Sequence, residues 1–325
     1  MNDTPFQTLL GEDPAFQSAI RSAHLLSATD VTVLITGESG SGKELFAHAI
    51  HASSPRAGEP FITINCAALP DSLAESELFG HARGSFTGAV ADREGRIQAA
   101  HGGTLFLDEV GELTPVVQAK LLRFLETGEV QPVGVNRPVT ANVRVVAATH
   151  RDLFQRVREG QFREDLYYRL NVVPVTVPPL RERSRDVEML LEHFLKSLAD
   201  KHQVAVPRLD AACRSTLLNH SWPGNVRELR NLCERLVILH PAEIVRSEHL
   251  PEELFSTSVE EDLSEIQGHG GFVLPESGID FSAMESHMIK QALRKARGNR
   301  SRAARLLGLT RDAFLYRIKK HAISF

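Results

Sequence analysis

The sequence predicts an α/β fold with a parallel sheet, followed by an all-helical subdomain and a small basic helical domain. A β-branched apolar run, Val31–Ile35, passes directly into the glycine-rich loop Gly37–Lys43, which implies the order strand, loop, helix. Further short apolar runs alternate with helix-length segments, which indicates βαβ units. The 325 residues correspond to roughly two domains at about 150 residues each.

The predicted α/β part contains an N-terminal helix and five strands. Residues 12–28 have the apolar spacing of an amphipathic helix. After the first strand, four more apolar runs have the length of strands: Phe61–Ile64, Thr104–Leu107, Val143–Ala148 and Val172–Val177. Helix-length segments such as Thr114–Thr127 lie between these runs. We therefore expect a parallel sheet with helical connections.

The pattern becomes helical after Pro179. Three segments separated by Pro and Gly have helical periodicity: Ser184–Lys201, Asp210–Asn219 and Asn225–Leu239. They predict a separate all-α subdomain. Residues 257–280 contain six acidic residues and no Lys or Arg, so we expect an extended, flexible linker there.

Three short helices are expected beyond this linker, at Phe281–Ala296, Ser301–Leu307 and Thr310–Lys320. The predicted domain organisation therefore has four parts: an α/β subdomain at 1–177, a helical subdomain at 178–256, a linker at 257–280 and a helical domain at 281–325.

The charge is divided unevenly along the chain. The formal net charge is −4, but residues 281–325 contain 11 Lys and Arg against 2 Asp and Glu, and residues 1–280 contain 26 against 39. The C-terminal part thus carries +9 and the rest carries −13. Such a basic segment predicts a polyanionic partner. With 42% hydrophobic residues, the chain has enough apolar material to exclude global disorder.

The cysteines and the N-terminus bear on the compartment. Cys66, Cys213 and Cys233 lie far apart and form no C-x-x-C pair, which argues against a disulfide framework and favours a reducing cytosol. Residues 1–17 lack the features of a signal peptide, and no apolar run approaches the ~18 residues of a membrane span. We expect neither secretion nor membrane insertion.

The glycine loop matches the pattern G-x-x-x-x-G-K, in which backbone N–H groups surround a phosphate and the Lys neutralises it at a helix N-terminus. A purely structural glycine turn is the alternative. The last position of the full signature departs from Ser or Thr. The predicted nucleotide-binding residues of the loop are Gly37, Glu38, Ser39, Gly40, Ser41, Gly42, Lys43 and Glu44.

Paired carboxylates end a later apolar strand. Asp108 and Glu109 follow Thr104–Leu107, about 65 residues after the loop. The first suits Mg²⁺ and the second suits the polarisation of an attacking water. An acidic turn at a strand end is the alternative. Arg163 and Arg169 lie six residues apart, and spacing alone does not separate them from ordinary surface arginines.

Two further motifs carry a family resemblance: Glu77–His81 followed by Gly84–Ala89, and Trp222–Leu229. With these motifs the chain resembles the bacterial enhancer-binding proteins, the AAA+ ATPases that activate sigma-54 RNA polymerase. The resemblance covers about residues 9–254 and again 281–323. It implies an AAA+ P-loop NTPase with a parallel β-sheet and an α-helical lid, plus a Fis-type helix-turn-helix domain. Glu44 is the usual residue at its position in that family.

The resemblance also implies roles for individual residues. Lys43 would contact the β- and γ-phosphates of ATP, Asp108 would bind Mg²⁺ and Glu109 would activate water. Asn65 matches the switch residue that bonds the catalytic Glu, and Thr149 matches sensor I. The arginines have separate roles: Arg227 matches sensor II of the lid, and Arg163 and Arg169 match the arginine fingers offered to a neighbouring subunit of a hexameric ring.

The loop Gly84–Ala89 is the part that would contact sigma-54. Its six residues are Gly84, Ser85, Phe86, Thr87, Gly88 and Ala89. Glycines at both ends predict a mobile hairpin with Phe86 exposed at its tip. In the family this loop grips sigma-54 in an ATP-dependent manner and remodels the closed promoter complex to the open one. Two residues depart from the family pattern: Ser85 replaces Ala, and His150 replaces the Asn that follows sensor I.

The basic tail has the pattern of a helix-turn-helix. Gly308 suits the turn and Thr310 suits an N-cap, while Phe314 and Ile318 would face inward. Leu315 is expected on the outer face, and the longer helix 281–296 would dimerise. The predicted DNA-binding residues are Arg300, Arg302, Thr310, Arg311, Asp312, Tyr316, Arg317, Lys319 and Lys320.

The leading hypothesis is therefore an ATP-hydrolysing activator that binds enhancer DNA, works as a dimer-to-hexamer homo-oligomer in the bacterial cytoplasm at the nucleoid, and uses ATP and Mg²⁺. Two alternatives are a different AAA+ remodeller, such as a helicase loader or chelatase subunit, and a ligand-controlled repressor that uses the ATPase fold as a scaffold.

The ATPase begins within about ten residues of Met1, which leaves no room for a sensor domain of ~100 residues. We therefore expect control in trans by an inhibitory or co-activator protein, or by regulated expression, as in phage-shock and virulence-type activators.

Overall fold

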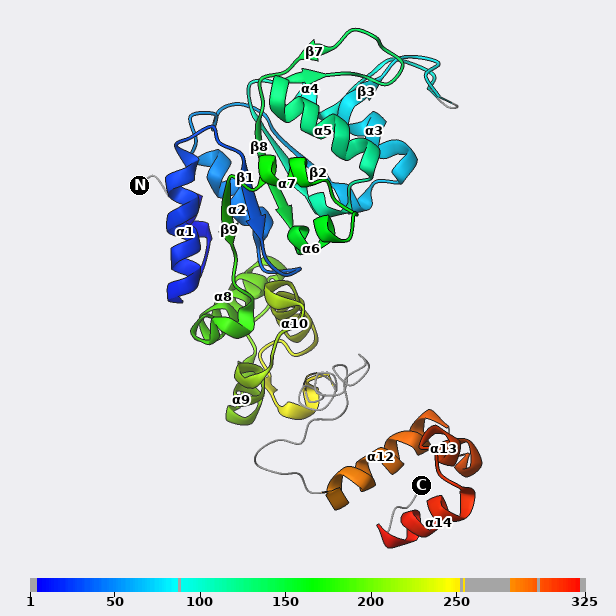
Figure 1. Ribbon diagram of the computed structural model, residues 1–325. Helices are drawn as coiled ribbons and strands as arrows, with labels where there is room; N and C mark the ends of the chain where they lie inside the picture. Colours follow the sequence, from blue (N-terminus) through cyan, green and yellow to red (C-terminus); the bar gives the residue numbers. More distant parts are fainter. Residues whose placement is uncertain (1–4, 87–88, 252–253, 255–280, 297–298, 322–325) are drawn as a thin grey trace. The chain divides into compact units, whose positions relative to one another are not determined.

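The computed structural model describes residues 5–86, 89–251, 254, 281–296 and 299–321 (Figure 1). The chain divides into two compact units, residues 1–257 and 258–325. The predicted linker at 257–280 lies outside the described residues, and the predicted domain boundaries stay predictions. No helix in the described part of the chain is long and apolar enough to cross a membrane.

A five-stranded parallel sheet forms the centre of the first unit. Its spatial order is β2-β5-β8-β1-β9. The strands are β1 (Val33–Thr36), β2 (Phe61–Asn65), β5 (Thr104–Asp108), β8 (Arg144–Thr149) and β9 (Val173–Thr176). These are the five predicted strands, each displaced by at most two residues. In parallel pairing all carboxyl ends meet at one edge of the sheet, where ligands bind in open α/β folds.

Helices cover both faces of this sheet (Figure 1). One face packs against η1 (Pro5–Thr8), α1 (Pro14–Ser27) and α2 (Lys43–Ala52). The other packs against α3 (Asp71–Phe79), α4 (Arg96–Ala99), α5 (Pro115–Thr127), α6 (Leu153–Arg158) and α7 (Glu164–Leu170). Side chains alternate along each strand, so Phe106 joins the first core and Leu105 and Leu107 join the second. Because both faces of the sheet are covered by helices, the residues on both sides of a strand are buried, so these strands are continuous apolar runs.

Short segments extend from the sheet between the main elements. The helical turns η2 (Cys66–Ala68) and η3 (Val110–Glu112) follow β2 and β5. Two small antiparallel pairs lie further out: β3 (Gly80–His81) with β4 (Arg93–Glu94), and β6 (Glu129–Val130) with β7 (Val139–Thr140). Strands β3 and β4 form the base of the segment that contains the predicted sigma-54 loop.

The subdomain after Pro179 has its own core around Trp222, which is fully buried. Its elements are η4 (Leu180–Glu182), α8 (Ser184–His202), β10 (Arg208–Leu209), α9 (Ala211–Asn219), α10 (Asn225–Leu239), β11 (Ile244–Val245) and η5 (Ser247–His249). Strands β10 and β11 pair in parallel. The prediction of an all-α subdomain was therefore wrong in this detail, because two-residue strands leave no readable apolar run.

The second unit contains α12 (Phe281–Lys295), α13 (Arg300–Leu306) and α14 (Arg311–Lys320) around a small core that includes Phe314. The turn between α13 and α14 has the predicted chemistry. Gly308 has a left-handed φ of 64°, and the Thr310 side chain accepts a hydrogen bond from the Ala313 backbone N–H. Phe314 is buried and Ile318 packs against the core, so the predicted inward face is confirmed.

Candidate functional site

The predicted ATPase residues meet at the carboxyl edge of the central sheet. Register places Asn65 opposite Asp108 and Thr149 opposite Thr36, which precedes the glycine loop. A cavity of about 520 Å³ lies there. Its lining residues are Ser39, Asn65, Cys66, Ala67, Leu69, Asp108, Glu109, Glu112, His150, Arg151 and Arg227. The cavity thus gathers residues from five distant segments of the sequence.

The glycine loop is held in a conformation that only glycine adopts without strain. Gly40 and Gly42 have φ angles of +77° and +104°. A Cβ at Gly40 would lie 2.3 Å from the Gly224 carbonyl oxygen of the lid, so this glycine also permits close approach of the two subdomains. Helix α2 begins directly after the loop, at Lys43. Its N-terminal N–H groups therefore face the loop, as in an anion-binding site.

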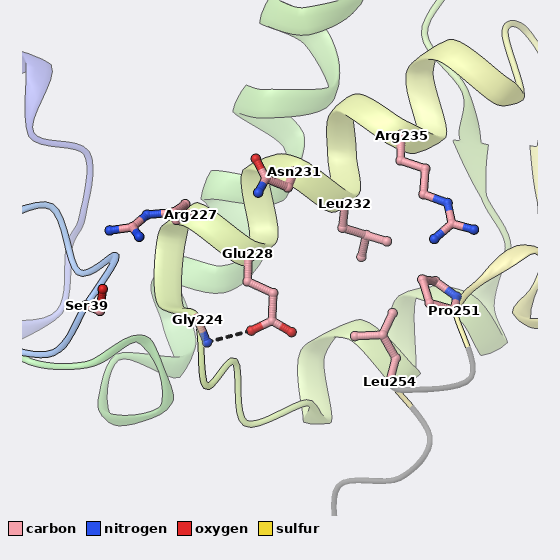
Figure 2. Close-up of a pocket in the computed structure, with 9 residues that line it drawn as sticks. All are labelled: Ser39, Gly224, Arg227, Glu228, Asn231, Leu232, Arg235, Pro251 and Leu254. Atoms are coloured by element: carbon pink, nitrogen blue, oxygen red, sulfur yellow. Dashed lines mark hydrogen bonds between the residues drawn. The ribbon is translucent and has the colours of Figure 1, made fainter. Parts of the chain in front are cut away.

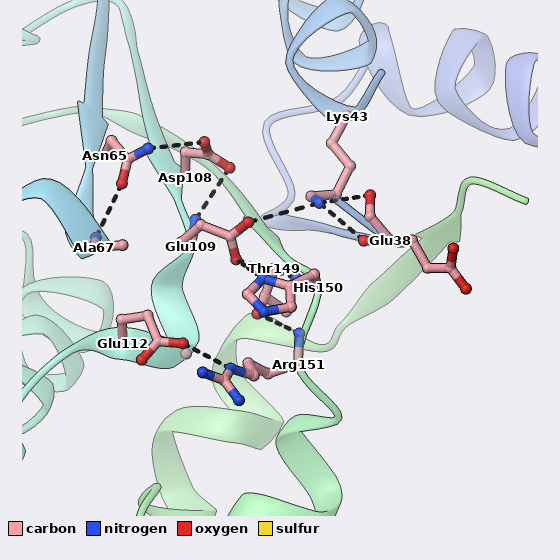
Figure 3. Close-up of polar contacts among 12 residues, drawn as sticks. Glu38, Lys43, Asn65, Ala67, Asp108, Glu109, Glu112, Thr149, His150 and Arg151 are labelled. Carbon is pink, nitrogen blue, oxygen red and sulfur yellow. Dashed lines mark hydrogen bonds and ion pairs between the residues drawn. The ribbon is translucent and has the colours of Figure 1, made fainter. Parts of the chain in front are cut away.

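Lys43 is buried and points back into its own loop (Figure 3). Its Nζ donates to the carbonyl oxygens of Gly37 at 2.8 Å and Glu38 at 3.2 Å, and lies 3.8 Å from Glu109 Oε1. Burial lowers the pKa of Lys43. An ammonium group with only carbonyls and one carboxylate around it is well placed to receive a phosphate.

Asp108 and Asn65 form a pair at the ends of β5 and β2. Burial and the neighbouring charge of Glu109 raise the pKa of Asp108. Asn65 Nδ2 donates to Asp108 Oδ2 at 3.4 Å, and Asn65 Oδ1 accepts from the Ala67 and Ala68 N–H groups. The expectation that Asn65 bonds Glu109 was therefore wrong for this structure, because parallel register sets Asn65 beside Asp108.

Glu109 is held by His150 (Figure 3). Its Oε2 accepts from His150 Nδ1 at 2.6 Å and from the His150 backbone N–H at 3.2 Å. Glu109 has a left-handed φ of 54°, which is unfavourable for a non-glycine residue and marks a constrained site. Thr149, the predicted sensor I residue, is fully buried. It lines a second cavity of about 430 Å³ with Gly37 and Glu38.

The lid contacts the glycine loop through several side chains. Arg227 extends from the start of α10 toward the loop at Ser39 (Figure 2). Glu38 accepts from both Nη atoms of Arg181, at 2.6 and 2.8 Å, and from Asn225 Nδ2 at 3.1 Å. The hydrogen bonds from Arg181 lower the pKa of Glu38. The loop and the lid are therefore joined by polar contacts.

Arg163 and Arg169 do not line the cavity at Asp108 and Glu109. Arg163 precedes α7 and pairs with Asp165 at 2.7 Å, with 48% of its side chain exposed. Arg169 donates to the Leu125 carbonyl oxygen from Nη2 at 2.8 Å and from Nε at 3.2 Å. Within one chain, both guanidiniums are therefore bonded to residues outside this cavity.

The predicted sigma-54 loop is only partly within the described residues, since Thr87 and Gly88 lie outside them. Phe86 is half-buried and packs edge-on against His81, with ring centroids 4.9 Å apart. The expectation of an exposed Phe86 was therefore wrong, because a single aromatic contact already covers part of the ring. Ser85 packs against Gly134, where a Cβ would lie 2.6 Å from the Ser85 Cβ. Gly84 N–H donates to the Ala89 carbonyl at 2.8 Å and closes the loop.

In the second unit, the predicted DNA-binding residues fall into two groups. Most are exposed on α13, on α14 or at the N-cap of α14: Arg300, Arg302, Thr310, Arg311, Tyr316, Lys319 and Lys320. The Asp312 side chain lies outside the described part. Arg317 is half-buried and its Nε donates to Glu285 Oε1 of α12 at 2.6 Å. Lys320 Nζ contacts the same carboxylate at 3.3 Å. The prediction of Arg317 as an outward-facing residue was wrong because Glu285 ties it to α12. Leu315 is half-buried rather than exposed.

Sequence reasoning missed three contacts of the ATP-site residues. It flagged His150 as a departure but assigned it no partner, and it gave no role to Arg181 or Asn225. For His150, its position directly after strand β8 could have indicated a contact with Glu109, because β8 pairs with β5 and Glu109 follows β5. Arg181 and Asn225 lie about 140 to 190 residues from Glu38 in the sequence, so no local pattern could have paired them.

Comparisons with known proteins agree with this geometry. Residues 9–176 match the sigma-54 interaction domain, residues 181–266 match the AAA+ ATPase lid domain and residues 281–321 match the Fis family of bacterial regulatory proteins. The transcriptional regulatory protein ZraR of Escherichia coli is 45% identical over 312 residues, which cover 96% of this chain and 68% of ZraR.

Two further proteins are similar over almost the whole chain. The DNA-binding transcriptional regulator NtrC of Escherichia coli is 44% identical over 330 residues, which cover 97% of this chain and 70% of NtrC. The crystal structure of NtrX from Brucella abortus in complex with ADP is 33% identical, with a TM-score of 0.71, and the match covers 97% of this chain and 69% of that one. The predicted family and fold class are confirmed. The chain belongs to the family of sigma-54-dependent transcriptional activators, in which a nucleotide-binding AAA+ ATPase with a helical lid is joined to a Fis-type helix-turn-helix DNA-binding domain.

Proposed function

We propose that this activator hydrolyses ATP between its glycine loop and its paired carboxylates, and uses the cycle to drive the loop Gly84–Ala89 against sigma-54. The observation that supports this most is the cavity lined by Asp108, Glu109 and Arg227, with Lys43 Nζ 3.8 Å from Glu109 Oε1. The cationic side chains suit the phosphates, and the carboxylates suit water and a metal ion. The other predicted residues of the loop, Gly37–Glu44, supply backbone N–H groups to the phosphates.

Lys43 and Arg227 are the proposed phosphate ligands. The ammonium of Lys43 exchanges the carbonyls of its own loop for phosphate oxygens, which are stronger acceptors because they are charged. Arg227 points from the lid toward Ser39 of the loop (Figure 2) and lines the cavity of Asp108 and Glu109. Binding of ATP then draws the lid and the α/β subdomain together, and Thr149 lies at the strand end beside the loop.

Asp108 fits Mg²⁺. Its carboxylate is half-buried beside Glu109. Burial first and the charge of Glu109 second raise the pKa of Asp108, and a divalent cation would offset both effects. Carboxylate oxygen is the donor that Mg²⁺ prefers, with waters and substrate phosphates as its other ligands. When bound there, Mg²⁺ supplies neutralisation of the β- and γ-phosphate charge. Asn65 orients the Asp108 carboxylate through its amide.

Glu109 is the proposed general base. It accepts a proton from water as the water oxygen bonds to the γ-phosphorus and the bond to the bridging oxygen breaks, with that electron pair leaving on ADP. Arg163 and Arg169 counter the developing charge in the neighbouring subunit. Neither arginine lines the cavity of its own chain, which supports supply in trans. A head-to-tail interface of this kind closes into a ring, and we propose a homo-oligomeric ring of up to six subunits.

The loop Gly84–Ala89 is the proposed contact to sigma-54. Phe86 rests on His81 in the structure and is only half-covered, so it retains apolar surface for a partner. In the second unit, exposed cations of α13 and α14 suit the phosphates of enhancer DNA. Dimerisation through α12 would present two recognition helices to a two-fold symmetric site.

The experiment is a comparison of Lys43→Ala, Glu109→Gln and Glu112→Gln in the full chain. Lys43→Ala is expected to lose ATP binding. Glu109→Gln is expected to retain ATP binding and lose hydrolysis by about 10²–10⁴-fold, the range for a general base. Glu112 lines the same cavity but pairs with Arg151 at 2.8 Å, so Glu112→Gln is the control for a lost carboxylate. Hydrolysis by Glu109→Gln at the rate of the control would refute the proposed role.

A further inference from the structure

The described part of the sigma-54 loop rests on Val133 and Gly134, between β6 and β7. The Ala82 N–H, just before the loop, donates to the Val133 carbonyl oxygen at 3.0 Å. Ser85 packs directly on Gly134, since a Cβ at this glycine would lie 2.6 Å from the Ser85 Cβ. Gly134 also has a left-handed φ of 79°. Glycine therefore permits this close approach, which we call the docked position of the loop.

The docked position encloses the Ser85 hydroxyl. Its Oγ is buried and has no hydrogen-bond partner among the residues that the structure describes, whereas the Ser85 backbone N–H donates to the Ala82 carbonyl oxygen at 3.2 Å. The Nδ1 atom of His81, whose ring contacts Phe86, is likewise buried with no partner in the described part of the chain. A buried polar group without a partner costs the free energy of removing it from water. Leaving the docked position would return the hydroxyl to water and remove this cost.

The hydroxyl can be separated from the packing of this side chain. The atoms of Ser85 nearest to the Cβ position of Gly134 are its own Cβ and Cα, at 2.6 and 3.4 Å, and Oγ lies at 3.8 Å. An Ala side chain has the same Cβ, so it would keep this contact and lose only the polar atom. Ala is also the residue that Ser85 replaces in the family pattern. The buried hydroxyl is thus a property of this chain, and it makes the docked position less stable than Ala would.

We propose that the buried Ser85 hydroxyl weakens the docked position of the sigma-54 loop, so that the loop leaves Gly134 readily and reaches sigma-54. Ser85 is then a positioning residue that sets the fraction of chains in which the loop is free. This inference rests on the proposed role of the loop as the sigma-54 contact. An aromatic ring contact and an unpaired buried hydroxyl contribute free energies of similar size, so the hydroxyl offsets the contact of Phe86 with His81. A partner that binds only the free loop has an apparent affinity proportional to the free fraction.

The first test measures hydrogen exchange of the Ala82 and Val133 amides in the full chain, without ATP or sigma-54. Both amides bond across the docked position, Ala82 to Val133 at 3.0 Å and Val133 to Gly80 at 2.9 Å, so they exchange when the loop leaves it. Ser85→Ala removes the unpaired hydroxyl and is expected to slow their exchange by about three- to tenfold. Ser85→Thr keeps the hydroxyl and adds a methyl group beside Gly134, so it is expected not to slow the exchange.

The matched control is Ser76→Ala on α3. The Ser76 hydroxyl is also buried, but it donates to the Leu73 carbonyl oxygen at 3.1 Å. Loss of a hydroxyl that has its partner is expected not to slow the exchange. The second readout is the protein concentration that gives half-maximal open-complex formation with ATP and sigma-54 RNA polymerase. It is expected to rise about three- to tenfold in Ser85→Ala and to stay within about twofold in Ser76→Ala.

The two readouts together decide the role of Ser85. Exchange at the wild-type rate in Ser85→Ala overturns the inference even if transcription falls, because the hydroxyl would then contact sigma-54 directly. Slower exchange with an unchanged half-maximal concentration overturns it as well, since docking would then not limit access to sigma-54. Phe86→Ala separates the two proposals: normal open-complex formation by this variant refutes the role of the loop. Its failure to form open complexes, together with wild-type exchange in Ser85→Ala, refutes only the role of Ser85.

Discussion

Glu38 of the glycine loop and Arg181 of the lid face each other through two hydrogen bonds of 2.8 and 2.6 Å. This bidentate geometry is the strongest form of an Arg–carboxylate contact. The same carboxylate accepts from Asn225 at the start of α10. The loop that is proposed to bind phosphate is therefore connected to the lid through the Glu38 side chain and, by a further hydrogen bond from Asn225, through the Ser39 carbonyl oxygen. The lid is expected to respond to changes in the loop.

Asn225 is expected to matter more for stability than Arg181. Asn225 is fully buried, has a left-handed φ of 53°, and accepts from the Leu180 N–H at 2.7 Å. Asn225→Ala leaves that buried N–H without its partner and should lower the free energy of unfolding by about 2–3 kcal/mol. Arg181→Met removes a half-exposed ion pair and should cost less than about 1 kcal/mol. Urea unfolding of both variants measures the difference. Equal losses would contradict the larger contribution expected of the buried amide.

Phe86→Ala is expected to separate ATP hydrolysis from transcription. The ring contacts His81 and lies outside the ATP cavity, so kcat for ATP should stay within about twofold. Sigma-54-dependent open-complex formation should be lost, because the apolar contact at the loop is removed. Promoter melting in a purified system measures this. Val90→Ala, at an exposed residue beside the loop, is the control and should retain transcription. Normal open-complex formation by Phe86→Ala would contradict the assignment.

Arg163 is expected to act in the neighbouring subunit. Arg163→Ala alone should lower kcat by roughly 10³-fold, and Lys43→Ala alone should be inactive. A mixture of the two variants should recover activity, since a Lys43→Ala subunit still offers its arginine to a neighbour that binds ATP. With equal, random mixing about a quarter of the interfaces are competent.

The recovery is measured as the rate of ATP hydrolysis at different mixing ratios of Arg163→Ala and Lys43→Ala. The matched control is a mixture of Lys43→Ala with Glu109→Gln, in which the chain that binds ATP lacks the proposed base. No recovery in the first mixture would show that the arginine acts within its own chain.

Glu285 is expected to make the basic domain sensitive to acid. Its carboxylate accepts from His321 Nε2 at 2.7 Å, Arg317 Nε at 2.6 Å and Lys320 Nζ at 3.3 Å. These contacts, that from His321 first, lower the pKa of Glu285 from 4.5 to about 2. A carboxyl group with a depressed pKa stabilises the folded state fully above its unfolded pKa. Its contribution is therefore lost as the pH falls from about 4.5 toward 2.

Hydrogen exchange of the α14 amides in the full chain measures this effect. Glu285→Gln should accelerate exchange at neutral pH, and its difference from the wild type should shrink below pH 4.5. Lys290→Gln, on the exposed side of α12, is the control for a changed charge. A difference that is constant across this pH range would exclude the carboxylate as its source.

Much of the fold could be predicted because its signals are local. The strand before Gly37 and the strand before Asp108 are continuous apolar runs, and burial on both faces requires such runs in a parallel sheet. Gly308 and Thr310 mark the helix-turn-helix by backbone conformation and capping within a few residues. The pair β10 and β11 was not predictable, since its strands have two residues each and lie about 35 residues apart.

The site divides in the same way. The residue types of Lys43, Asp108 and Glu109 follow from short motifs, and their meeting at one edge follows from parallel strands. The hydrogen-bond partners of these side chains cannot be read from the motifs. Whether Asn65 bonds Asp108 or Glu109 depends on the register of β2 against β5.

By itself, the sequence determined the family, the order of the elements and the chemical groups available for ATP hydrolysis and DNA binding. These features depend on motifs and periodicity, which are patterns of residues close together in the chain. Only the tertiary structure decided that His150 holds Glu109, that Phe86 rests on His81 and that Arg317 is tied to Glu285. These contacts join residues on separate elements, and the geometry of a side-chain hydrogen bond is set by packing to within a few tenths of an ångström. Sequence spacing contains no information at that scale.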